Sequence, residues 1–233
     1  MLRFWKTLNI LYERLLLIFM ALVLLICVWC AYDNYYVYSS AADETVTKYK
    51  PVPGVSSAVA DSPITEDMVA WLTIDGTSID YPVMQASDNV KYLNTDPFGA
   101  YSLSGSIFLD SACSPDFSDD YSLIYGHHME LGKMFGALDD FLKESYLKKH
   151  TSGTLMVGRN AETVYDIEVF AAMKTTARAD TVFSPGKGDI RSYIQSSADV
   201  FLGDGGGRII GLSTCAGDSP ASRTVVFCRI IDR

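Results

Sequence analysis

The apolar residues divide the chain into one long N-terminal run and a larger part in which short apolar runs alternate with polar segments. Residues 15–32 are apolar without interruption, and their number, 18, is about what a helix needs to cross a bilayer. Basic residues precede this run and acidic residues follow it, so the positive-inside bias places the N-terminus in the cytoplasm and the rest outside. The pattern predicts a transmembrane signal anchor. The alternative is a cleavable signal peptide, because Ser40, Ala41 and Ala42 offer small residues for a peptidase.

After the apolar run, the sequence predicts a tether followed by a short helix. Residues 33–62 are rich in Ser, Ala, Pro and Tyr and show little periodicity, which is typical of an extended linker. Ser62 is then followed by a proline and by acidic residues, which are signals of a helix start. A helix is therefore expected from about Pro63 to Ala70.

The remaining pattern is that of a mainly β domain. Short apolar runs bounded by turn residues follow in close succession, and eight of them predict a closed or nearly closed β-barrel. The strands are expected at 71–74, 79–84, 105–110, 121–125, 154–158, 162–173, 207–214 and 223–231. Apolar residues at helical spacing predict two helical insertions, Phe135–Lys148 and Asp189–Val200.

Composition narrows the classes of partner and site. Outside the first 32 residues the chain carries 16 basic and 27 acidic residues, a net charge of −11, which disfavours nucleic acid and anionic lipid as partners. Two of the five cysteines lie in the apolar run, which leaves an odd three outside it and argues against a disulfide scaffold. Outside that run no CxxC, HExxH or EF-hand pattern supports a metal site.

Two apolar runs near the C-terminus carry a candidate nucleophile and a cation. Residues 209–215 end in Cys215, and Arg223 opens the next run after a short polar loop. A neighbouring cation favours a thiolate and stabilises the anion that forms when the thiolate attacks a carbonyl. The alternative is a buried structural cysteine. Because side chains alternate along a strand, Cys228 is expected to point away from Arg223 and to be a buried residue of the core. Cys113 is expected to be core filling or a surface thiol.

Two of the three histidines, His127 and His128, stand side by side after the apolar run 121–125. Cysteine catalysis needs a histidine that is near in space but can be remote in sequence, and one of this pair could supply it. The alternative is a loop histidine that bonds to the backbone. His150 ends a predicted helix, where a cation suits the helix dipole, so no catalytic role is expected for it.

Several motifs follow one another along the chain: Trp71–Ile74, Ile79–Gln85, Asp88-Asn89 with Tyr92–Asn94, Gly105–Asp110, Tyr125–Met129, Gly132–Phe135, Leu212–Cys215 and Arg223. In this order they resemble the class B sortases, the cysteine transpeptidases of Gram-positive cell surfaces. The resemblance covers about residues 64–231 and implies a sortase-type eight-stranded β-barrel with short helices inserted. The expected organisation is a cytoplasmic N-terminus (1–14), a transmembrane signal anchor (15–32), an extracellular tether (33–62) and a sortase catalytic domain (63–233).

The resemblance implies the roles of three catalytic residues. The catalytic imidazole directly follows Tyr-Gly in that family, which points to His127 and makes His128 a bystander. Cys215 would attack the threonine carbonyl of a C-terminal sorting signal with a Pro-x-Thr core. Arg223 would stabilise the oxyanion, and its alternative role is that of a solvated charge at a strand end.

Three further residues are expected to contact substrate. By their spacing, Asn89 and Leu93 match positions with which class B sortases line the groove for the sorting signal; the alternative is a capped helical turn with one apolar contact. Ser213 precedes Cys215 by two residues on the same strand face, so its hydroxyl could meet the substrate. The alternative for Ser213 is a small polar residue of the barrel wall.

The sequence therefore suggests a membrane-anchored transpeptidase with its catalytic domain outside the cell. The resemblance implies that no cofactor is required and that the partners are secreted proteins bearing a sorting signal. The amine that resolves the thioester would come from peptidoglycan precursor, or from a pilin lysine. Two other classes stay open: a cysteine hydrolase, in which water resolves the acyl-enzyme, and an inactive surface binding module.

Overall fold

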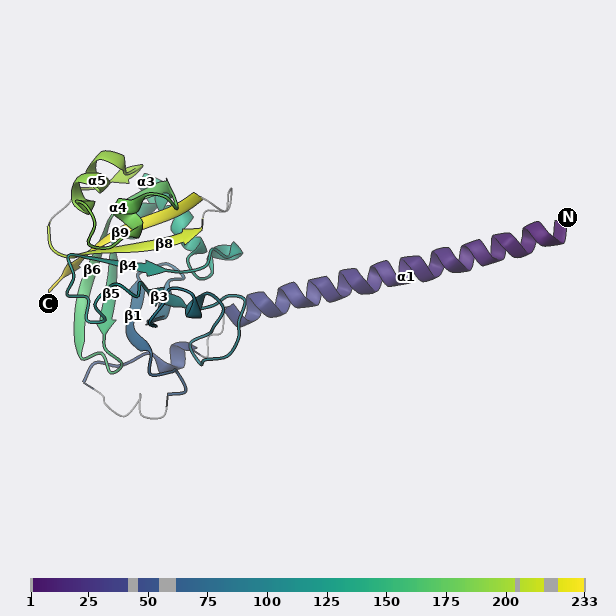
Figure 1. Ribbon diagram of the computed structural model, residues 1–233, viewed down its shortest axis with the longest axis horizontal. Coiled ribbons are helices and arrows are strands. Elements are labelled where there is room, and N and C mark those ends of the chain that lie inside the picture. Colours follow the sequence, from purple (N-terminus) through teal and green to yellow (C-terminus); the bar gives the residue numbers. More distant parts are fainter. Residues whose placement is uncertain (1, 42–45, 55–61, 204–205, 216–221, 233) are drawn as a thin grey trace. The chain divides into compact units, whose positions relative to one another are not determined.

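The structure is a computed structural model that describes residues 2–41, 46–54, 62–203, 206–215 and 222–232. The chain divides into two compact units, Met1–Ser40 and Ala41–Arg233 (Figure 1). The first unit is one helix, α1 (Leu2–Ala41), and Arg3–Tyr35 within it is long and apolar enough to serve as a membrane anchor. This helix extends the predicted span at both ends, because residues 2–41 contain neither glycine nor proline to interrupt it.

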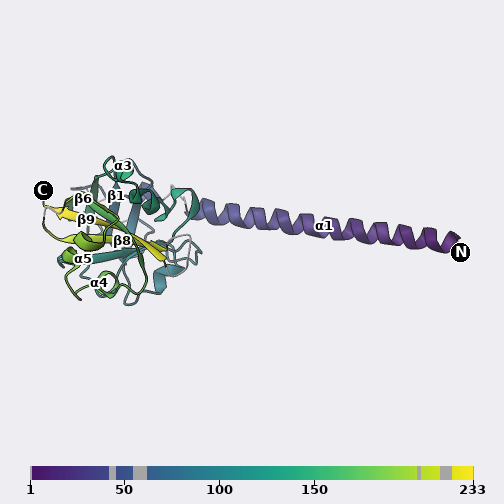
Figure 2. The same ribbon diagram turned by 90° about the horizontal axis from the view of Figure 1, so that it is seen from above.

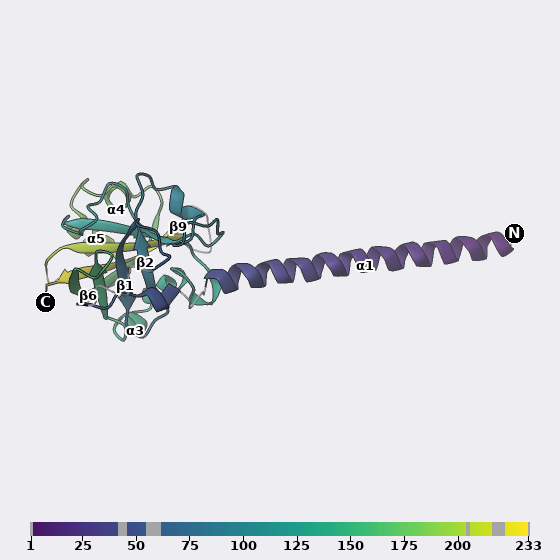
Figure 3. The same cartoon turned by 90° about the horizontal axis from the view of Figure 1, so that it is seen from below.

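The second unit is built on a closed β-barrel. Its strands are β1 (Met68–Ile74), β2 (Asp80–Met84), β3 (Ile107–Leu109), β4 (Tyr121–Tyr125), β5 (Ser152–Val157), β6 (Thr163–Thr176), β7 (Val200–Phe201), β8 (Ile209–Cys215) and β9 (Ser222–Ile231). Neighbours follow the order β5-β1-β2-β3-β4-β8-β9-β6, and β6 pairs with β5 to close the barrel. Figure 3 shows β1 and β2 side by side in this wall. The eight predicted strands and the barrel are confirmed, and β7 is an additional short strand on β6.

Two of the strand pairs are parallel, β2 with β3 and β4 with β8, and the others are antiparallel. Parallel strands end at the same edge of a sheet. The C-terminal ends of β4 and β8 therefore lie together, although the two strands are more than 80 residues apart in the sequence.

Helices cover part of the outer wall. Helices α4 (Asp180–Phe183) and α5 (Ile190–Ser197) contribute Val182 and Ile194 to a buried cluster that includes Val225 and Phe227 of β9 (Figure 2). The centre of β9 is therefore buried on both faces, which explains why residues 225–228 are a continuous apolar run rather than an alternating pattern. The sequence did not predict α4, which is only four residues long.

The helix predicted over Pro63–Ala70 is wrong. The chain makes a turn at Glu66-Asp67, and β1 begins at Met68. Met68 and Ala70 are buried and pair with β2, so tertiary packing overrides the local helix-start signal. The Asp67 carboxylate accepts hydrogen bonds from Lys91 Nζ and Tyr92 Oη, and these contacts lower the pKa of Asp67.

The two predicted helical insertions are present but shorter than expected. The first is broken into a 3-10 helix, η4 (Gly136–Leu142), and one turn of α-helix, α3 (Glu144–Leu147), because Lys143 between them is extended. The second is α5, which begins after Asp189, whose side chain accepts a hydrogen bond from Ser192 N. The remaining short 3-10 helices are η1 (Val46–Tyr49), η2 (Lys91–Leu93) and η3 (Glu130–Gly132).

Part of the expected tether packs on the barrel. Helix η1 contributes Val46 and Tyr49 to the apolar cluster around Trp71, and Pro51 is buried. Lys50 Nζ lies 2.7 Å from Asp80 Oδ1, and that carboxylate also accepts a 2.7 Å hydrogen bond from Trp71 Nε1. Residues 46–51 are therefore a structural part of the barrel unit.

Candidate active site

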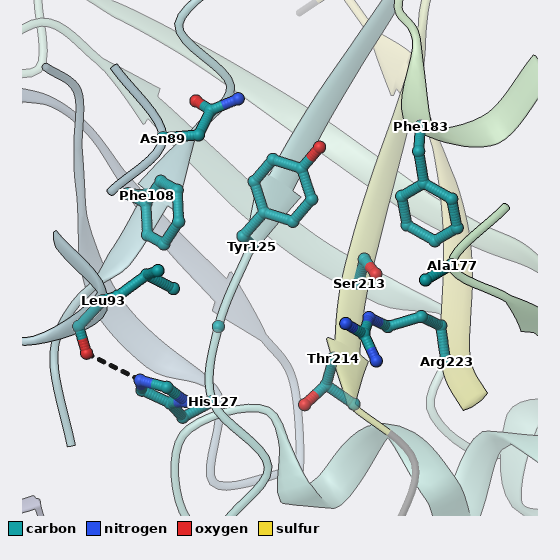
Figure 4. A pocket seen from close by; sticks show the side chains of 11 residues that line it. Asn89, Leu93, Phe108, Tyr125, His127, Ala177, Phe183, Ser213, Thr214 and Arg223 are labelled. Atoms are coloured by element: carbon teal, nitrogen blue, oxygen red, sulfur yellow. Dashed lines mark hydrogen bonds between the residues drawn. The ribbon is translucent and has the colours of Figure 1, made fainter. Parts of the chain in front are cut away.

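A pocket of about 320 Å³ opens where β4 and β8 end (Figure 4). Its lining residues are Asn89, Leu93, Phe108, Tyr125, Gly126, His127, Ala177, Phe183, Ser213, Thr214 and Arg223. Five of the six residues predicted from the sequence to serve catalysis or substrate binding are in this set. The sixth, Cys215, has only its backbone described.

Cys215 is the last residue of β8, and its side chain lies outside the described part of the structure. Its Cα is paired with that of Arg223 at the start of β9. Directly paired residues of an antiparallel ladder stand on the same face of the sheet. The register therefore puts Cys215 on the face whose Arg223 side chain lines the pocket.

Ser213 lies on that same face and forms part of the pocket wall. Only 1% of its surface is exposed, and its Oγ has no hydrogen-bond partner in the described part of the chain. A buried hydroxyl without a partner is costly unless a ligand or water satisfies it. Figure 4 shows Ser213 next to Arg223, with Phe183 and Ala177 beyond them.

His127 follows the end of β4 and lies across the pocket from Arg223 (Figure 4). Its Nε2 is 2.7 Å from the backbone oxygen of Leu93. A carbonyl oxygen only accepts, so this contact assigns the proton to Nε2 and leaves Nδ1 free for proton transfer in the neutral ring. The preceding Gly126 has no room for a side chain, because a Cβ there would lie 2.4 Å from Ile107 Cδ1.

The other two histidines lie outside the pocket lining. His128 Nε2 is 2.9 Å from Asp139 Oδ2, and the second oxygen of that carboxylate accepts a hydrogen bond from Thr224. This pairing ties the loop after β4 to β9. His150 Nδ1 is 3.1 Å from the backbone oxygen of Asp75 and its ring stacks on Tyr146.

The two described cysteines of the barrel are buried, and neither lines the pocket. Cys228 is fully buried, as predicted, and burial raises the pKa of its thiol. Cys113 is only 5% exposed, so the expectation of a surface thiol is wrong and the expectation of core filling holds. Its Sγ points to the backbone oxygen of Tyr121, and burial raises its pKa to about 11. Both thiols are therefore poor nucleophiles.

Sequence reasoning did not single out the aromatic side chains of the pocket. Tyr125 stands at its centre in Figure 4, and Phe108 and Phe183 form apolar walls. Burial and the adjacent Asp110 raise the pKa of Tyr125, which keeps its hydroxyl protonated. Tyr125 could have been predicted as a pocket residue because it belongs to the Tyr-Gly-His motif. Phe183 could not, because the short helix α4 that carries it leaves no pattern in the sequence.

Comparisons with known proteins identify the family of this chain. A model of the sortase domain matches residues 72–231. The chain is 33% identical to sortase B of Staphylococcus aureus over 181 residues, 72% of each protein. It is 37% identical to sortase B of Listeria monocytogenes over 161 residues, 65% of this chain and 64% of that protein. The chain belongs to the sortase family.

The relatives place this sortase in class B. The crystal structure of a Streptococcus pyogenes class B sortase involved in pilus biogenesis matches with a TM-score of 0.66 at 35% identity, and the match covers 72% of this chain and 94% of that one. The resemblance drawn from the sequence motifs is therefore confirmed. Among the described residues of the sortase, no group of three or more His, Cys, Asp or Glu side chains could hold a metal ion.

Proposed function

We propose that this sortase is a membrane-anchored cysteine transpeptidase that cleaves a C-terminal sorting signal of the Pro-x-Thr type after its threonine and joins the protein to an amine of the cell-wall precursor. One observation carries the proposal. His127 and Arg223 line one pocket, and Cys215 at the end of β8 is paired in register with Arg223 at the start of β9.

In the first half-reaction, Cys215 Sγ loses its proton to His127 and bonds to the threonine carbonyl carbon. The carbonyl oxygen becomes an oxyanion, which the Arg223 guanidinium stabilises by hydrogen bonds. The C–N bond of the signal then breaks, and His127 returns the proton to the departing amine. The product is a thioester between Cys215 and the threonine.

In the second half-reaction, an amine attacks the thioester carbonyl. His127 accepts the proton of the amine and returns it to the leaving Cys215 sulfur, so no net proton is gained or lost. The free nitrogen for these transfers is Nδ1, because Nε2 is held by Leu93 O. Asn89, Leu93 and Ser213 would contact the signal peptide from the pocket wall.

The acceptor amine has a second candidate. One similar protein is a class B sortase involved in pilus biogenesis, which favours a pilin lysine as the alternative acceptor. In either case we infer that α1 anchors the enzyme with its N-terminus in the cytoplasm, because Arg3, Lys6 and Arg14 precede the apolar run.

Product masses test the proposal. The full chain in detergent micelles is incubated with a Pro-x-Thr peptide library and with a short peptide α-amine, a lysine-containing peptide, or no amine. The proposal predicts peptide bonds between threonine and one class of amine. Hydrolysis that is insensitive to added amine would favour a cysteine hydrolase, and peptide binding without any cleavage would favour an inactive binding module.

A further inference from the structure

Asp110 is a buried carboxylate next to the pocket that the proposed mechanism does not use. It directly follows β3 and is only 4% exposed. Its Oδ1 accepts a 2.8 Å hydrogen bond from Ala112 N. Its Oδ2 accepts two, from Asn89 Nδ2 at 3.0 Å and from Tyr125 Oη at 2.8 Å. Both side chains that donate to Oδ2 line the pocket.

These contacts fix the orientation of the Asn89 amide. Its Nδ2 donates to Asp110, and its Oδ1 accepts a 2.8 Å hydrogen bond from Ser111 N. If the amide were flipped, its NH₂ group would face the Ser111 N–H and its oxygen would face Asp110 Oδ2. Only the observed orientation therefore forms both hydrogen bonds. Among the described residues, one N–H and one oxygen lone pair of Asn89 have no partner and are available to a ligand.

The same carboxylate fixes the direction in which the Tyr125 hydroxyl donates its hydrogen bond. A phenol has one proton and also accepts, and here the proton is directed to Asp110. Tyr125 can therefore only accept a hydrogen bond from a ligand in the pocket. Together, Tyr125 and Asn89 present two acceptors and one donor, which suits the N–H and C=O groups of an extended peptide.

We propose that Asp110 is a positioning residue of the sortase pocket, whose carboxylate orients Asn89 and Tyr125 for binding of the sorting-signal peptide. This inference rests on the proposed function. Only a carboxylate supplies acceptors on both oxygens. An asparagine at 110 would place its NH₂ group against Ala112 N–H in one orientation and against the Asn89 and Tyr125 donors in the other.

A double-mutant cycle separates positioning from a merely structural role. Peptide affinity is measured by titrating a Pro-x-Thr peptide into the full chain in detergent micelles, with Cys215→Ala as the background so that no turnover occurs. Asp110→Asn is expected to weaken binding about tenfold, as for loss of hydrogen bonds to a charged group. In an Asn89→Ala, Tyr125→Phe background the same substitution is expected to weaken binding less than about twofold.

Asp96→Asn is the matched control. Asp96 Oδ1 also accepts two hydrogen bonds, from Phe98 N and Ala100 N, but Asp96 does not line the pocket. Its substitution should leave peptide affinity unchanged. With Cys215 restored, Asp110→Asn should also leave the rate of thiol alkylation by a small reagent unchanged, because the reagent does not need the Asn89 and Tyr125 contacts.

An equal loss of affinity from Asp110→Asn in both backgrounds would overturn the inference while leaving the proposed function intact. Absence of peptide binding in the Cys215→Ala chain with no other substitution would instead overturn the proposed function, and this inference with it. If Asp110→Asn does not fold, the cycle between Asn89→Ala and Tyr125→Phe replaces it. Non-additive losses would support a shared acceptor, and additive losses would contradict it.

Discussion

The adjacent histidines His127 and His128 differ in what they contact. The ring of His127 lines the pocket and bonds to a backbone carbonyl, whereas that of His128 pairs with Asp139 outside the pocket lining. The sequence motif distinguished them only through a family resemblance. Their contacts give a physical reason for the same choice, because His127 lines the pocket and His128 does not.

His127→Ala should lower kcat/KM by about 10²- to 10⁴-fold, the usual contribution of a general acid and base. His128→Ala should cost less than about tenfold, since it removes one partly exposed contact with the Asp139 carboxylate. Steady-state kinetics with a Pro-x-Thr peptide and an amine would measure both variants. The reverse ranking would mean that His128 is the proton-transfer group.

Replacing Arg223 with lysine separates the effect of its positive charge from the effect of its hydrogen-bond geometry. A lysine keeps the positive charge but cannot reproduce the planar fork of a guanidinium. If Arg223 aims hydrogen bonds at the oxyanion, Arg223→Lys should lower kcat/KM by about 10²- to 10³-fold, the usual cost of one oxyanion donor. The pH profile of Cys215 alkylation should change little. Near-normal turnover would show that the residue acts through its charge alone.

At the scale of elements, strands were more predictable than helices. Each barrel strand contains an apolar or β-branched run, so all eight could be predicted from the sequence, within a few residues. The helix expected over Pro63–Ala70 failed because its local start signals competed with burial of Met68 and Ala70 in β1. Helix α4 has only four residues, too few to show a period.

The docked segment 46–51 gives a prediction about stability. Lys50→Ala should lower the free energy of unfolding of the barrel by about 1 kcal/mol, because it removes a charge-assisted hydrogen bond to the partly buried Asp80 and a hydrogen bond to Thr73 Oγ1. Lys48→Ala is the matched control, since Lys48 is exposed in helix η1, which ends just before Lys50. Thermal unfolding of both variants would measure the difference. Equal stability of the two variants would contradict the assigned role of Lys50.

At the scale of the whole molecule, the sequence predicted the two main parts but not how the pocket is completed. The apolar run and the strand pattern are local signals that can be read in order. The pocket instead depends on the parallel pairing of β4 with β8, which brings together segments more than 80 residues apart in the sequence. Residue spacing does not specify such a pairing, so His127 could be joined to the Cys215 and Arg223 strands in advance only through the resemblance.

The proposed reaction depends on Cys215 as the nucleophile, and intact-protein mass spectrometry shows which cysteine carries the acyl group. The full chain is mixed with a Pro-x-Thr peptide without amine, and the mass of the trapped acyl-enzyme is measured. A thioester adduct is expected on the unsubstituted chain. It is also expected on the Cys113→Ala and Cys228→Ala variants, because the thiols that these substitutions remove are buried. It is not expected on the Cys215→Ala variant. An adduct that persists in Cys215→Ala, or cleavage by that variant at a comparable rate, would contradict the account.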